Sequence, residues 1–123
     1  MSVRFVFIGM LLLLASSCTK YKEEAVMAEA NAQKFCQMDS VKFTDVQPII
    51  SNNCMPCHDN DQAQGGITLV TYDDISFQAT DGALLSSINH DGTTVPMPSS
   101  APKLHDCYIY AIQTWTSQGA QNN

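Results

Sequence analysis

The sequence predicts an all-α domain built from four to five short helices. With 123 residues, the chain is long enough for one small domain. Apolar residues recur at helical spacing in separate segments, and stretches rich in glycine and proline divide those segments. No two stretches read as paired strands. These observations together favour a helical architecture.

The first helix is expected to begin near Phe43. Val46, Ile49 and Ile50 recur there at the spacing of one helix face, and Thr44 is the expected N-cap residue. The domain itself is therefore placed at residues 41–123.

The middle of the chain predicts a loop followed by two helices. Residues 59–66 are polar and end in two glycines, which is typical of a loop. Residues 67–70 are short and β-like, but no partner strand is evident, so an irregular segment is expected. The two helices are Tyr72 to Ala79, with acidic residues at its amino end, and Gly82 to Asn89.

The end of the domain predicts an irregular stretch and a last helix. Residues 91–103 contain three prolines and a glycine, which exclude a regular element. The last helix is expected from about His105 to Gln118, with Gly119 as its stop signal. His105 stands where a serine or threonine cap is usual, so we expect a weak helix start.

The amino terminus predicts export and anchoring. Residues 1–17 combine a positive start, an apolar run and small residues, which is typical of a signal peptide. Cys18 follows at once, so we expect a lipidated first residue of a mature lipoprotein held in the periplasm or cell envelope. Residues 18–40 then read as a largely solvated tether. The alternative is ordinary signal cleavage after Ser17, without a lipid.

The segment Cys54-Met55-Pro56-Cys57-His58 is the principal motif. In an exported protein, two cysteines three apart followed by histidine form the attachment signature of a c-type haem. On a helical turn these three side chains share one face, so both thiols can bond the porphyrin edge while His58 ligates the iron. The sequence thus predicts one covalently bound haem c.

Met97 is the expected second ligand of the iron. It lies between Pro96 and Pro98, which restrict the backbone on both sides and hold the thioether in place. His90 and His105 are competing ligands, and a methionine can also simply fill a gap in the core. The weaker methionine candidates are Met38 and Met55.

The five cysteines predict one disulfide bond. Cys54 and Cys57 are assigned to haem and Cys18 to lipid, which leaves Cys36 and Cys107. In an oxidising compartment such a pair tends to bond, although two buried free thiols remain the alternative.

The formal net charge of −6 argues against nucleic acid as a partner, because phosphate binding rests on clustered lysine and arginine. We expect the partners to be other redox proteins and, through the lipid, a membrane.

A set of residues spread along the domain carries a resemblance to a known family. They are Val46-Gln47-Pro48-Ile49-Ile50, Asn53-Cys54, Cys57-His58, Gly65-Gly66-Ile67, Tyr72, Pro96-Met97-Pro98, Lys103-Leu104, Asp106-Cys107, Ile112, Trp115 and Gly119-Ala120.

Through these residues the chain resembles the small class I cytochrome c domains of bacterial respiratory chains, including short single-haem cytochrome lipoproteins of Bacteroidetes-type bacteria. The resemblance implies that Cys54 and Cys57 carry the thioether bonds to the haem, that His58 is the proximal ligand and that Met97 is the distal ligand. Many such domains use a proline carbonyl soon after the motif to orient the histidine, yet no proline lies between His58 and Pro96. A backbone carbonyl near Gly66 or Ile67 is expected to replace it.

The expected function is electron transfer rather than catalysis, with no small-molecule substrate. When the iron has two axial ligands, no coordination position is left on it for a substrate. One alternative is a haem-based peroxidase or gas sensor whose distal ligand is displaced. Another is a haem-free zinc site that uses Cys54, Cys57 and His58.

Overall fold

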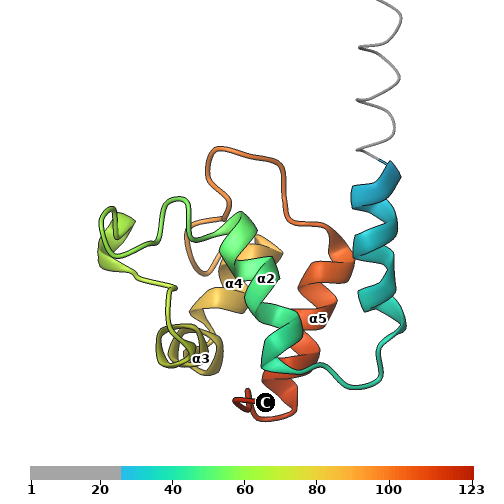
Figure 1. Cartoon of the computed structure of the whole chain (residues 1–123). Helices are drawn as coiled ribbons and strands as arrows, with labels where there is room; N and C mark the ends of the chain where they lie inside the picture. The colour runs from blue at the N-terminus through green and yellow to red at the C-terminus, as the bar shows by residue number, and fades with distance from the viewer. Residues whose placement is uncertain (1–25) are drawn as a thin grey trace, which may run out of the picture. The chain divides into compact units, whose positions relative to one another are not determined.

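The computed structural model describes residues 26–123, and every regular element in that range is helical. The expectation of an all-α chain is confirmed for this range. The chain divides into two units after Gln33. The described part of the first unit, residues 26–33, is helical. The second unit contains η1 (Lys34–Gln37), α2 (Phe43–Asn53), η2 (Gln64–Gly66), α3 (Tyr72–Asp81), α4 (Ala83–Asn89) and α5 (Asp106–Ser117) (Figure 1).

Helix α5 is the centre of the second unit, since it contacts η1, α2, α3 and α4. Its inward face carries five buried side chains, of which Trp115 is the largest. The Phe43 ring packs against the rings of Trp115 and Tyr72, with distances of 5.7 Å and 5.1 Å between ring centroids. The contact with Tyr72 is edge to face. The Tyr72 hydroxyl donates to the Ala120 carbonyl over 2.8 Å. Aromatic packing thus joins the start of α2, the start of α3 and the end of α5.

The start of α2 differs from the sequence expectation, and Thr44 is not its N-cap. The helix begins at Phe43, and its N-cap is Lys42, two residues before Thr44, whose place it takes; the Lys42 N–H donates to the Asp45 carboxylate. The N–H groups of Phe43 and Thr44 donate to the side chain and the backbone oxygen of Asn123. Donors that usually need a local cap are satisfied here by a residue eighty positions away.

The other helix boundaries lie close to those expected from the sequence. Thr71 and Asp74 form a reciprocal capping box at the start of α3. At the end of α5, Gly119 has a φ of 94°, and its N–H donates to Thr116 while that of Ala120 donates to Trp115. This is a Schellman motif, in which glycine adopts the left-handed conformation without a steric penalty.

Residues 34–41, directly before α2, belong to the second unit, whereas a solvated tether was expected as far as residue 40. Phe35 in η1 is only 6% exposed, and Val41 is 2% exposed. The side chain of Gln118, at the end of α5, accepts from the Val41 N–H and donates to the Asp39 carbonyl. The compact unit therefore starts at Lys34, before the boundary expected at residue 41.

Cys36 and Cys107 are disulfide-bonded, with their sulfurs 2.02 Å apart, and the bond connects η1 to the first turn of α5. The expected signal peptide and the lipidation site at Cys18 lie outside the described residues. Within residues 26–123, no helix has the length and apolar content needed to cross a bilayer.

Candidate functional site

The cysteine motif forms a helical turn directly after α2. The N–H groups of Cys54 and Met55 both donate to the Ile50 carbonyl, so the turn continues the helix. Those of Cys57 and His58 both donate to the Cys54 carbonyl over 3.1 Å. Residues three and four apart on such a turn lie on the same side. This is the local geometry expected from the spacing of the motif.

Cys54 and Cys57 are free thiols in the described part of the chain, and both are half-buried. Burial raises the pKa of the Cys54 thiol to about 11, because the thiolate loses its hydration there. The neutral thiol of Cys54 therefore predominates at physiological pH.

The His58 ring is oriented by a backbone carbonyl. Its Nδ1 lies 3.1 Å from the Ile67 oxygen, which can only accept, so Nδ1 carries the hydrogen. In the neutral ring Nε2 then presents a lone pair, as metal ligation requires. The Leu69 N–H also donates to the His58 carbonyl over 2.8 Å. Ile67 thus supplies the carbonyl that was expected in place of a proline.

Two glycines make this return of the chain possible. Gly65 and Gly66 have φ angles of 68° and 74°. Residues with a Cβ atom disfavour such positive φ angles, whereas glycine adopts them readily. They close the loop after the motif and direct the chain back, so that residues 67–69 run beside His58. The loop expected at residues 59–66 is present, with the short helix η2 at its end.

The four residues predicted to bind haem all line one cavity of about 470 Å³; they are Cys54, Cys57, His58 and Met97. This volume is within the usual range for ligand sites. A second cavity of about 440 Å³ is also lined by Cys54, His58 and Met97, and Ile88 lines both. The remaining lining is largely apolar and includes Pro98, Leu104 and Tyr108 in the first cavity and Ile67, Leu84 and Val95 in the second.

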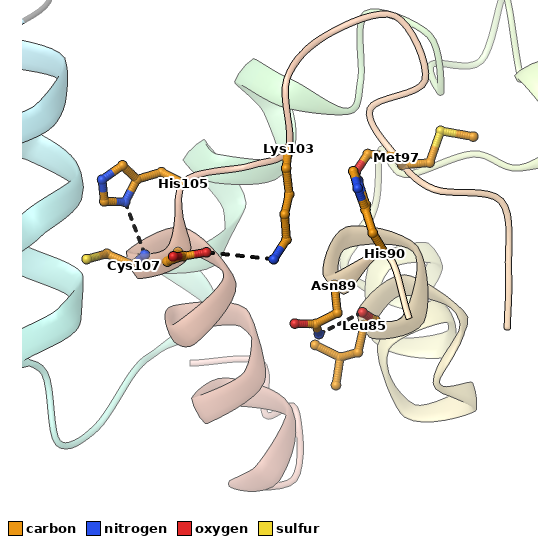
Figure 2. Close-up of polar contacts among 8 residues, drawn as sticks. Leu85, Asn89, His90, Met97, Lys103, His105 and Cys107 are labelled. Atoms are coloured by element: carbon orange, nitrogen blue, oxygen red, sulfur yellow. Dashed lines mark hydrogen bonds and ion pairs between the residues drawn. The ribbon is translucent and has the colours of Figure 1, made fainter. Parts of the chain in front are cut away.

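The backbone of Met97 is held on both sides by the end of α4. Its N–H donates to the Ser87 carbonyl over 3.0 Å. Its carbonyl lies 2.9 Å from the His90 Nε2. Figure 2 shows the His90 ring at the Met97 backbone, with the Met97 side chain extending away from it. The His90 ring is therefore hydrogen-bonded to the backbone of the methionine.

The loop that leads to Met97 is fixed by Asp91. Its carboxylate accepts from the Ser86 hydroxyl over 2.6 Å and from the Thr93 hydroxyl and N–H. These hydrogen bonds, the one from Ser86 above all, hold the pKa of Asp91 below its usual value. Thr94 continues the network by hydrogen bonding to Ser86 and Ser87.

His105 caps α5, contrary to the weak helix start expected for it. Its Nδ1 accepts from the Cys107 N–H over 3.1 Å, as a serine or threonine oxygen would (Figure 2). An ion pair of 3.8 Å between Lys103 and Asp106 lies in the same turn. His105 lines the larger of the two cavities, whereas His90 is not among the residues that line either of them.

The hydrogen bonds from His58 to the Ile67 carbonyl and from His90 to the Met97 carbonyl join residues that no local sequence pattern pairs. Sequence reasoning anticipated the first only as a carbonyl near Gly66 or Ile67, and it missed the second. Within residues 26–123, no three His, Cys, Asp or Glu side chains are gathered closely enough to hold a metal ion. No protein-family model, curated protein or solved structure matches the chain.

Proposed function

We propose that the domain is a single-haem c-type cytochrome with a class I cytochrome c-like fold, and that it carries one electron at a time between redox proteins of the cell envelope. The observation that carries the proposal is the common cavity lined by Cys54, Cys57, His58 and Met97. In this assignment Cys54 and Cys57 form the two thioether links, and His58 and Met97 are the axial ligands.

The residues present fit a haem on three counts. Two free thiols lie on one turn, half-buried beside an apolar cavity. The His58 ring donates from Nδ1 and keeps Nε2 available. Met97, whose backbone is fixed by Ser87 and His90, lines the same cavity.

A bound haem supplies one-electron Fe(III)/Fe(II) chemistry, and the protein sets its potential through the ligands and the apolar surroundings. The Ile67 carbonyl makes His58 a stronger donor by sharing its Nδ1 hydrogen. The soft thioether of Met97 favours the reduced state. The largely apolar surface of the cavity raises the cost of the more charged oxidised state.

The test is the full chain produced together with a bacterial cytochrome c maturation system. We expect c-type spectra, haem that stays with the protein in acid-acetone, reversible one-electron reduction, and the near-infrared band of an Fe–S(Met) bond. Haem that extracts completely, or zinc without iron on metal analysis, would overturn the proposal.

Met97→Leu is expected to abolish the near-infrared band and to open the sixth position. Carbon monoxide should then bind the reduced protein more than about tenfold tighter, because a ligand bond worth over 1.4 kcal/mol no longer competes. The reduction potential should fall, since the thioether no longer favours ferrous iron.

Met55→Leu is the matched control, since Met55 lies within the motif but is not among the residues that line the two cavities. It should leave both the band and carbon monoxide binding unchanged. A Met97→Leu protein that keeps the band would exclude Met97 as the ligand. Rapid carbon monoxide binding by the unsubstituted protein would instead favour the peroxidase or sensor alternative.

A further inference from the structure

The three residues Pro96, Met97 and Pro98 contain a single backbone N–H, because proline has none. That N–H, on Met97, donates to the Ser87 carbonyl in the last turn of α4. The Ser87 carbonyl also accepts from the His90 N–H over 3.4 Å, and its second lone pair is available for the Met97 N–H. One side of the Met97 peptide is thereby attached to α4.

The other side is attached through His90. Its Nε2 lies 2.9 Å from the Met97 oxygen, and a carbonyl only accepts, so Nε2 carries the hydrogen. His90 can reach this oxygen because it ends α4 in the left-handed conformation, at φ 58° and ψ 41°. A residue with a side chain is uncommon in that region of φ.

We propose that His90 is a positioning residue, which holds the Met97 carbonyl and so keeps the thioether directed at the iron. The inference rests on the proposed function. His90 itself touches neither iron nor haem in this assignment. It acts through the Met97 backbone, together with the Ser87 carbonyl.

His90→Gly separates this role from a purely structural one. Glycine adopts the left-handed conformation more easily than histidine, so the end of α4 is preserved while the ring donor is removed. A role limited to ending the helix predicts unchanged or tighter Met97 ligation. The positioning role predicts weaker ligation, which cyanide binding to the oxidised protein and the near-infrared band both report.

The expected effect is about two- to tenfold tighter cyanide binding and a weakened near-infrared band, the range that one hydrogen bond supplies. His90→Gln is the rescue variant, because its amide nitrogen reaches about as far as the imidazole Nε2 and also donates. It should restore both readouts. His90→Asn tolerates the same backbone but is too short to reach, and should behave like His90→Gly.

The outcomes distinguish this inference from the proposed function. If the unsubstituted protein shows the band and His90→Gly binds cyanide equally well, the positioning role fails and the cytochrome assignment stands. If His90→Gly does not accumulate, the comparison of His90→Asn with His90→Gln decides the question, and equal ligation in those two overturns the inference. If the unsubstituted protein carries no haem, both are overturned.

Discussion

The Cys54→Ser/Cys57→Ser double variant is expected to lose all of its haem to acid-acetone. Serine cannot form the thioether bonds, so any haem left in the cavity would be held only by His58, Met97 and apolar contact. Each single variant keeps one thiol and should retain haem through one bond. Extraction followed by mass spectrometry of the protein measures the number of links directly.

The control for this experiment is the other pair of cysteines. Cys36→Ala/Cys107→Ala removes two sulfurs that are bonded to each other and do not line the two described cavities. It should keep covalently bound haem in full. Haem that remains covalent after both motif cysteines are replaced would contradict the assignment of the motif.

The same Cys36→Ala/Cys107→Ala variant is expected to lower the free energy of unfolding by about 4 kcal/mol. The bond joins residues 71 apart in the sequence, and a closed loop of that length removes much of the entropy of the unfolded chain. Cys36→Ala alone should cost about as much, since either change breaks the bond. Denaturant titration of the haem-loaded full chain measures the difference.

A loss below about 1 kcal/mol would show that the folded domain does not depend on this bond. The structure gives a reason to expect the full effect. Phe35, next to Cys36, is buried with its ring 5.5 Å from that of Tyr108, next to Cys107. The disulfide and this aromatic pair hold η1 against the first turn of α5.

The helical elements were largely predictable because their signals are local. The acidic residues at the start of α3, the apolar face of α4 and the glycine after α5 each act within a few positions of the chain. The loop that ends in Gly65 and Gly66 was predictable for the same reason. The local geometry of the cysteine motif was also predictable from the sequence, since a short helical turn sets it.

The elements that differed from expectation depend on contacts between distant residues. Lys42 rather than Thr44 is the N-cap of α2, because Asn123 accepts from the first two helical N–H groups. From its composition, the segment around Phe35 was interpreted as a polar spacer. In the structure it packs against α5, which buries Phe35. His105 became an effective cap through the orientation of its ring, which composition does not specify.

For the candidate site, the sequence by itself determined which residues are the candidates: two thiols and an imidazole on one turn, and a methionine held between prolines. Only the tertiary structure decided that Cys54, Cys57, His58 and Met97 line one cavity, that the Ile67 carbonyl orients His58, and that His90 holds the Met97 backbone. The physical reason is that helices and turns form through hydrogen bonds between near neighbours, whereas a cavity forms only where separate helices and loops pack together.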